Sequence, residues 1–84
     1  LNKMYLEIIT PDKKVFAGEV TAAQFPGANG SFEVLDSHAP LISTLEKGRI
    51  RVTTNKSQEF FTVDGGVVEV LNNKIIVLAE SVTE

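Results

Sequence analysis

The side chains that could do chemistry are few in this sequence, and the best-grouped of them are Asp36, Ser37 and His38. They are the three residue types of a hydrolytic triad. A triad, however, needs side chains that converge in space, whereas consecutive residues of an extended chain point apart. His38 is the only histidine and has no partner base or nucleophile, so it is better interpreted as a hydrogen-bonding brace of a loop. The sequence predicts no catalytic residue.

Sites for a cofactor or a metal ion are not predicted either. The segment Pro26 to Gly30 contains two glycines but does not precede a helical pattern, so it fits neither a phosphate-binding loop nor a dinucleotide fingerprint. The chain has no cysteine, and one histidine is too few for a zinc site. Its carboxylates lack the spacing of a calcium loop or of a general acid–base pair. We expect no cofactor-binding residue, no metal ligand and no cofactor.

Length and composition limit the chain to one small domain, residues 1–84. It has 84 residues, of which 43% are hydrophobic, enough for a single core. Leu1 to Lys3, which precede Met4, are either an added tail or the native start. No run of ~20 apolar residues and no signal-peptide pattern is present, so we expect a soluble chain.

The charge balance argues against nucleic acid as a partner. The formal net charge is -3, whereas a grip on phosphate backbones needs a clustered basic face. Lys47, Arg49, Arg51 and Lys56 gather near one segment, but alternation along a strand would place Arg49 and Arg51 on a solvated face.

The hydrophobic pattern has a period close to two almost everywhere, and no window shows the spacing of a helix that buries one face. This predicts an all-β domain. The strand-like runs are Tyr5 to Ile9, Lys14 to Phe16, Glu19 to Phe25, Ser31 to Leu35, Leu41 to Leu45, Arg49 to Thr54, Glu59 to Val63, Val67 to Leu71 and Ile75 to Ala79. Turn formers separate them, among them Gly48 and Gly65-Gly66. We expect a small antiparallel β-sandwich of about nine to ten short strands in two sheets, with a closed barrel as the alternative.

Two local patterns are more specific. Asn72-Asn73 lies between two apolar runs and predicts a tight type I′ hairpin, because asparagine tolerates the positive φ that this turn requires. Ile50 and Val52 alternate with polar residues, which predicts a strand with one buried and one solvated face.

The segment His38-Ala39-Pro40-Leu41 is the strongest of several motifs whose order is informative. The others, in chain order, are Ile8 to Asp12, Val15 to Val20, Pro26 to Leu35, Gly48 to Val52, Phe60 to Val70 and Ile75 to Glu80. Together they resemble the epsilon subunit of F-type ATP synthases, the counterpart of the mitochondrial delta subunit, along nearly the whole chain. The positions that depart from the family's pattern are Ser31, Glu33, Asp36-Ser37 and Asp64.

The resemblance implies a β-sandwich that acts as a non-catalytic rotor subunit in the central stalk and couples the gamma subunit to the c-ring during proton-driven ATP synthesis. The residues that would contact the gamma subunit, by motif position, are Thr10, His38 and Ser43. Those that would contact the polar loops of the c-ring are Asn29, Gly30 and Ser31. The resemblance also implies a location at the cytoplasmic face of the bacterial inner membrane, peripheral and held there through the complex. The family's pair of C-terminal helices would begin after Glu80, so we expect the sandwich without its helical domain in a sequence that ends at Glu84.

Two other classes of protein stay open. A lipoyl- or biotin-carrier domain is also a flattened β structure with a lysine at a hairpin tip, and Lys74 follows the predicted hairpin turn. The neighbours that follow it, Ile75-Ile76, do not match those of a carrier lysine. An OB-like oligonucleotide binder needs aromatic platforms beside basic residues, and at most one of the adjacent Phe60 and Phe61 could serve.

Overall fold

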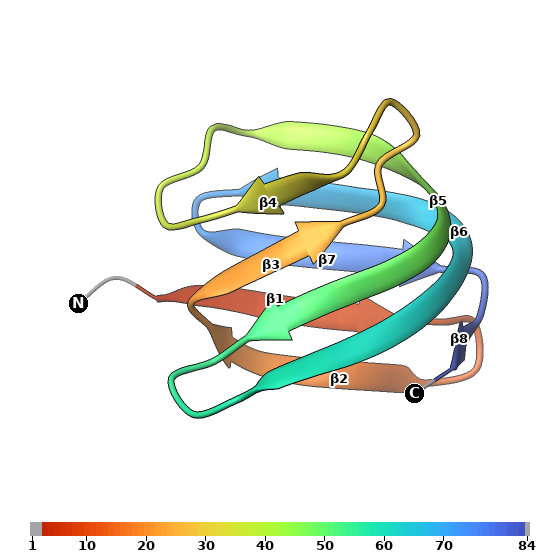
Figure 1. Ribbon diagram of the computed structural model, residues 1–84, viewed down its shortest axis with the longest axis horizontal. Helices are drawn as coiled ribbons and strands as arrows, with labels where there is room; N and C mark the ends of the chain where they lie inside the picture. Colours follow the sequence, from red (N-terminus) through yellow and green to blue (C-terminus); the bar gives the residue numbers. More distant parts are fainter. Residues whose placement is uncertain (1–2, 84) are drawn as a thin grey trace.

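The computed structural model describes residues 3–83, and this part of the chain is all β, without a helix (Figure 1). Its strands are β1 Met4–Ile9, β2 Lys14–Val20, β3 Ala22–Phe25, β4 Phe32–Val34, β5 Leu41–Thr53, β6 Gln58–Leu71, β7 Lys74–Ala79 and β8 Val82–Thr83. Residues 1 and 2 of the suggested N-terminal tail lie outside the described part. Lys3 is exposed and forms an ion pair with Glu19 at 3.4 Å. Residues 3–83 contain no helix that is long and apolar enough to cross a membrane.

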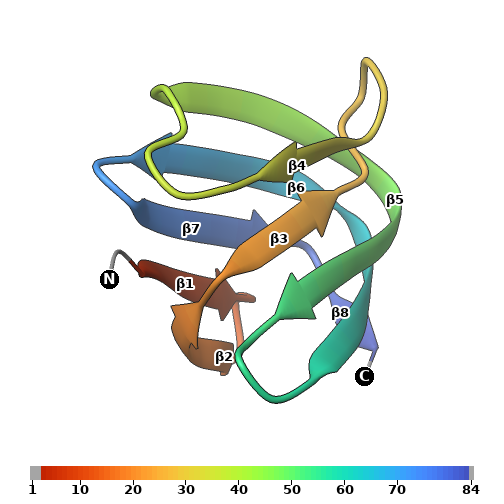
Figure 2. The same cartoon turned by 60° about the vertical axis from the view of Figure 1, so that its left-hand side comes forward.

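One continuous sheet folds over onto itself to make the two layers of the sandwich. The strand order is β2-β1-β7-β6-β5-β3-β4, and β8 pairs with β6 off this path. The long strands β5 and β6 curve from one layer into the other (Figures 1 and 2). The Leu41–Leu45 half of β5 pairs with the Gly66–Leu71 half of β6, which also pairs with β7, whereas the other halves of β5 and β6 lie beside β3 and β8. The expected all-β sandwich is confirmed.

The core fills the space between the layers with aliphatic side chains and a few rings. Its buried members are Met4, Leu6, Ile8, Val20, Ala23, Phe25, Val34, Leu45, Ile50, Val52, Phe61, Val63, Val68, Val70, Ile75, Val77 and Ala79. The Phe16 ring on β2 meets the Phe61 ring on β6 edge to face, with centroids 5.7 Å apart. Each fully buried Val, Leu, Ile or Phe contributes about 1.5–3 kcal/mol, so this core is the main source of stability.

Several predicted strand boundaries were wrong. Gly48 was expected to separate two strands, but β5 runs without a break from Leu41 to Thr53, and β6 likewise runs through Gly65-Gly66. The predicted run Glu19 to Phe25 is instead divided at Thr21 between β2 and β3. The described residues therefore form eight strands, some of them long, in place of nine or ten short ones.

The glycine pair makes a bend inside β6 because it lets the strand change the face it buries. One face of β6 carries Val70, Val68 and Gly66. The next buried residues are Val63 and Phe61, and because Val63 lies an odd number of positions before Gly66, these two belong to the opposite phase of the alternation. Gly65 and Gly66 have φ of 89° and 149°, which side chains rarely adopt. Glycine at such a corner is the usual device for folding a sheet.

Glu80 and Ser81 form hydrogen bonds with the backbone groups of this bend. The Glu80 N–H donates to the Gly65 carbonyl at 3.2 Å, and the Asp64 N–H donates to the Ser81 carbonyl at 3.2 Å. Beyond the bend, β8 replaces β7 as the neighbour of β6. The corner is therefore hydrogen-bonded and not an open loop.

Two further features concern strand pairing. β1 pairs with β7 in parallel, from Tyr5 opposite Lys74 to Ile9 opposite Leu78, although an antiparallel sandwich was predicted; the other pairs are antiparallel. The predicted type I′ hairpin is confirmed, because Asn72 and Asn73 have φ of 52° and 62° between β6 and β7.

We expect Gly66→Ala to destabilise the domain by about 2–4 kcal/mol, because it combines a strained φ with a collision. A Cβ at this position would collide with the Leu78 carbonyl oxygen and lie 2.9 Å from the Ala79 Cα. The measurement is urea denaturation followed by circular dichroism. Gly30→Ala is the matched control: its φ is 121° but nothing lies within 4 Å of the added carbon, so we expect a loss of about 1 kcal/mol. Equal midpoints for the two variants would contradict this account of the bend.

Candidate functional site

The three residue types of a triad do not form a catalytic relay. The Ser37 hydroxyl donates to the Asp36 carboxylate at 3.3 Å. The His38 ring does not join them: its Nδ1 lies 2.8 Å from the Ala39 carbonyl, which only accepts, so Nδ1–H is the donor. Among residues 3–83 no group of three His, Cys, Asp or Glu side chains could hold a metal ion. His38 thus braces its own loop, as the sequence predicted.

The His38 loop is fixed to the β6–β7 hairpin through Asn73. The Asn73 amide nitrogen donates to Asp36 Oδ1 at 2.7 Å, and its amide oxygen accepts the Ser37 N–H at 2.8 Å. The Asn73 carbonyl also accepts the Tyr5 N–H of β1 at 2.9 Å. Ser37 has a φ of 65°. One asparagine therefore positions the loop that carries His38 against two strands.

Thr10 occupies the tight turn between β1 and β2. Its hydroxyl oxygen accepts the N–H groups of Asp12 and Lys13, each at 3.3 Å, and its own N–H donates to the Lys13 carbonyl at 2.9 Å. These bonds are typical of a threonine that shapes a turn. Beside it lies an open, mostly apolar hollow of about 310 Å³, whose other lining residues include Ile9, Pro11 and Leu78.

Ser43 lies in β5, and its register determines the direction of its side chain. It is directly opposite Val68, which is fully buried, so both side chains lie on the inner side of the sheet. Ser43 remains half-buried because β5 is paired with β6 on one side only at this position. On the side away from β6, the first β-partner of β5 is Gly27, which bridges Leu45. The neighbours that point outward are Ile42 and Thr44.

The three residues expected at the gamma subunit are not brought together. Thr10 follows Ile9 and Leu78 at one end of the layer, whereas His38 lies at the other end, beside Asn73 and Tyr5. With ~3.3 Å per residue along β1, they are roughly 15–20 Å apart. No single small contact can include both.

The surface between Thr10 and His38 is unusually apolar. Its residues point outward from β5, β6 and β7 and are Ile42, Val67, Leu71, Ile76 and Leu78; we term them the outer apolar face. Ile42 is 71% exposed, Leu78 56%, Leu71 48% and Val67 41%. The outward side of such a layer is usually polar, and a contiguous apolar patch marks an interaction site. Figure 1 shows this layer as the adjacent strands β1, β7, β6 and the first half of β5.

Sequence reasoning missed this face, although a signal was present. Lys74–Ala79 carries apolar residues in both phases of the alternation, Ile75 and Val77 inside but Ile76 and Leu78 outside. A strand with only one covered face would carry polar residues in the second phase.

The residues expected at the c-ring do come together. Asn29, Gly30 and Ser31 are exposed at the tip of the loop between β3 and β4, which projects beyond the layers (Figure 2). The base of the loop is fixed, since the Ala28 N–H donates to the Thr44 carbonyl at 2.9 Å and the Gly30 N–H to the Gly27 carbonyl at 3.0 Å.

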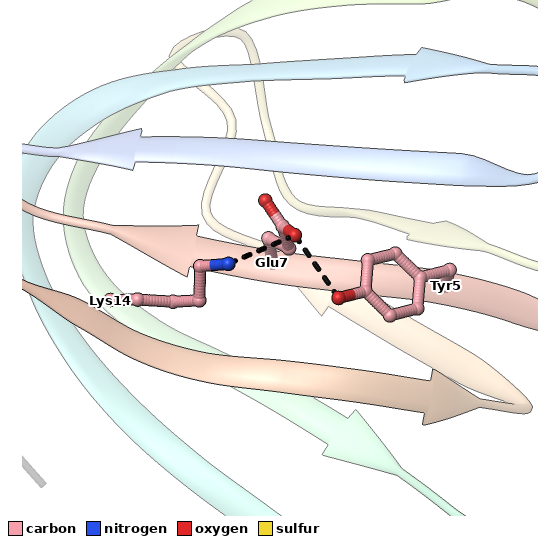
Figure 3. Close-up of polar contacts among 3 residues, drawn as sticks. All are labelled: Tyr5, Glu7 and Lys14. Carbon is pink, nitrogen blue, oxygen red and sulfur yellow. Dashed lines mark hydrogen bonds and ion pairs between the residues drawn. The ribbon is translucent and has the colours of Figure 1, made fainter.

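A polar group borders the outer apolar face on β1 and β2 (Figure 3). The Tyr5 hydroxyl donates to Glu7 Oε2 at 3.0 Å, and Lys14 Nζ lies 3.3 Å from the same oxygen. The hydrogen bond from Tyr5, followed by contact with Lys14, lowers the pKa of Glu7, and burial opposes the shift. The same hydrogen bond raises the pKa of the Tyr5 hydroxyl. Glu7 is thus a satisfied carboxylate, held ionised by its neighbours.

A carrier domain would depend on Lys74, and an oligonucleotide binder on Phe60 or Phe61. These residues do not lie where those functions require them. Lys74 is the first residue of β7, paired with Leu71, and does not occupy the turn itself. Phe61 is buried in the core, so Phe60 is the exposed ring of the pair, and the Arg49 guanidinium covers it at 4.5 Å from the centroid. Neither a carrier tip nor a free stacking platform is formed.

We expect Tyr5→Phe to raise the pKa of Glu7 toward the ordinary value of 4.5, because the largest cause of the shift is removed. The measurement is an NMR titration of the Glu7 carboxyl carbon. A lowered folded-state pKa stabilises the fold at pH above the ordinary value and loses this effect as pH falls through the folded-state pKa. The stability difference between wild type and Tyr5→Phe should therefore disappear in acid. Lys14→Gln, which removes a smaller cause, should raise the pKa less; an unchanged pKa in Tyr5→Phe would refute the assignment.

Comparison with known proteins gives the family. Residues 3–84 match the model of the ATP synthase delta/epsilon chain β-sandwich domain. The ATP synthase epsilon chain of Chlorobium limicola is 43% identical over 79 residues, covering 93% of this chain and 90% of that protein. The epsilon chain of Caulobacter vibrioides is 35% identical over 84 residues, covering 100% of this chain and 98% of that protein. In the epsilon chain of Salinibacter ruber, 37% identical, the match covers only 60% of the relative.

Solved structures share the fold at low sequence identity. A chain of the Euglena gracilis mitochondrial ATP synthase, from a structure of OSCP, F1 and c-ring, superposes with a TM-score of 0.91 at 17% identity, over 96% of this chain and 52% of that one. A chain from the central stalk and c-ring of the Tetrahymena thermophila enzyme gives a TM-score of 0.83 at 15% identity, over 99% of this chain and 67% of that one. With the family model and the curated relatives, the conclusion is direct: the chain belongs to the delta/epsilon family of ATP synthase subunits and forms its β-sandwich domain.

Proposed function

We propose that this chain is a non-catalytic central-stalk subunit of an F-type ATP synthase and couples the gamma subunit to the c-ring during proton-driven ATP synthesis. The observation that carries the proposal is the exposed outer apolar face on a member of this family. The relatives named ATP synthase epsilon chain, and the neighbours from central-stalk and c-ring assemblies, support this role.

The gamma subunit docks, in this proposal, on the outer apolar face. Thr10 and His38 lie at its two ends, so a partner that covers the face touches both without their being close to each other. Ile42, the most exposed of the large apolar side chains, lies near the start of β5, at the edge of this layer. Covering such side chains removes apolar area from water and provides the association energy. Ser43 points to the inner side of its layer but is only half-buried at the unpaired edge of β5, and it contributes there, at the edge of this contact.

The c-ring contact uses a different surface. Asn29, Gly30 and Ser31 form a polar loop tip, which suits the polar loops of a ring better than it suits an apolar shaft. Two surfaces on one body are what a coupling subunit needs, since torque passes only if the body does not yield. The single folded sheet, with its close-packed core, resists such deformation.

The proposed location follows from the partners. The chain lies at the cytoplasmic face of the bacterial inner membrane, peripheral and attached through the gamma subunit and the c-ring. ATP is neither bound nor hydrolysed by this domain, and nucleic acid is not a partner.

We expect Ile42→Ser to weaken binding of the purified gamma subunit by tenfold or more, because a buried isoleucine contributes about 1.5–3 kcal/mol. His38→Ala and Ser43→Ala should weaken it by smaller factors. The measurement is isothermal titration calorimetry. Phe60→Ser is the matched control: it removes a side chain 41% exposed on the other layer and should leave affinity unchanged. Wild-type affinity in Ile42→Ser and in the His38 and Ser43 variants together would rule out this docking face.

We expect a cysteine at Ser31 to form a disulfide with a cysteine in the polar loop of the ring subunit when the assembled complex is oxidised. The reason is proximity, since a disulfide requires Cα atoms within about 7 Å. Ser57→Cys is the control, because Ser57 is also exposed but lies in the turn between β5 and β6, where its carbonyl accepts the Thr54 N–H, at the opposite end of the β3 layer. Cross-linking from Ser57 but not from Ser31 would reverse the proposed orientation.

A further inference from the structure

One charged residue stands in the centre of the outer apolar face. Glu69 on β6 points outward between Ile42 of β5 and Ile76 of β7, its direct cross-strand neighbours. Val67 and Leu71 flank it along its own strand and point the same way. Four apolar side chains therefore surround one exposed carboxylate.

Glu69 differs from the other carboxylate of the same cross-strand row. Ile42, Glu69, Ile76 and Glu7 follow one another across β5, β6, β7 and β1. Glu7 has Tyr5 and Lys14 as partners. Glu69 makes no hydrogen bond and no ion pair with any residue between positions 3 and 83. Lys74, on the same face, does not pair with it within 4 Å.

The surface is also hollowed on both sides of Glu69. One shallow hollow, about 350 Å³, is lined by Glu69 together with Pro40, Leu41, Ile42, Val70 and Leu71. A second, about 190 Å³, is lined by Glu69 together with Leu71, Lys74 and Ile76. A partner that fills these hollows removes water from the carboxylate between them.

Covering an ionised carboxylate with apolar groups alone is strongly unfavourable. A partner that binds this face must therefore supply a cation at its centre. We infer that Glu69 selects the partner by pairing with a lysine or arginine that projects from an otherwise apolar surface of the gamma subunit. The apolar ring provides contact area, and the charge pair sets the register of the two surfaces.

The inference rests on the proposed function, because it takes the gamma subunit as the partner of this face. The probe is the purified gamma subunit, titrated calorimetrically against wild type, Glu69→Gln, Glu69→Lys and Glu7→Gln. Glu69→Gln keeps the size of the side chain and removes its charge. Because Glu69 is exposed and makes no polar contact with residues 3–83 of the free chain, the thermal midpoint of each Glu69 variant should equal that of wild type, which separates binding from folding.

We expect binding at least about tenfold weaker for Glu69→Gln, because the partner's cation would be buried without an anion. For Glu69→Lys we expect binding about a hundredfold or more weaker, because two cations would repel each other there. Glu7→Gln, which changes the already paired carboxylate, should alter affinity by less than about fivefold. If Glu69→Gln binds like wild type while Ile42→Ser binds weakly, the charge inference is overturned and the docking face stands. If neither variant loses affinity, the docking face itself is wrong and the charge inference fails with it.

Discussion

The close approach of backbone at Gly66 is the constraint on which the rest of this fold depends. A single sheet can serve as both layers only if its two longest strands bend, and β6 bends where Gly66 lies against the backbone of Leu78 and Ala79. β5 bends beside it, where Gly48 lies against the Pro26 ring: a Cβ added to this glycine would be only 2.9 Å from the proline Cβ. Without these side-chain-free positions the apolar halves of β5 and β6 could not face each other across one core.

The bend also separates the two proposed docking surfaces. On one side of it, the first half of β5 and the second half of β6 present the outer apolar face with β7. The β3–β4 loop is attached at the bend itself, through the bridge between Gly27 and Leu45 and the bond from the Glu46 N–H to the Pro26 carbonyl at 2.8 Å. A force on the loop tip is therefore transmitted to the bend of the sheet, through which both β5 and β6 run.

Sequence reasoning predicted what is local and missed what depends on distant partners. Alternation identified Ile50 and Val52 as inward-facing, and Asn72-Asn73 was identified as a type I′ turn, because strand period and turn φ are properties of a few consecutive residues. A pair of glycines, however, can form either a turn or a bend, and the pair itself does not tell which of the two it forms. What makes Gly65-Gly66 a bend is the pairing of this segment with Glu80 and Ser81, which local sequence does not contain.

The same division applies to the candidate site. The loop tip at Asn29 to Ser31 could be predicted as a turn, and the structure shows these residues exposed together. The direction of Ser43 could not, since it follows from the register that places Ser43 opposite Val68. The position of Glu69 among Ile42, Ile76, Val67 and Leu71 likewise appears only when three strands are aligned. Register between strands is set by the whole core.

The parallel pairing of β1 with β7 has a consequence for how the polypeptide reaches this state. Leu6 pairs with Ile75, so the first strand obtains its second neighbour from a segment about seventy positions further along. Such a contact closes a long loop and favours slow folding. On a ribosome, β1 and β2 can form their hairpin early, but one edge of β1 stays open until β7 has emerged. Completion of the sheet therefore waits for the synthesis of β7, and until then the unpaired edge of β1 is the part most exposed to mispairing.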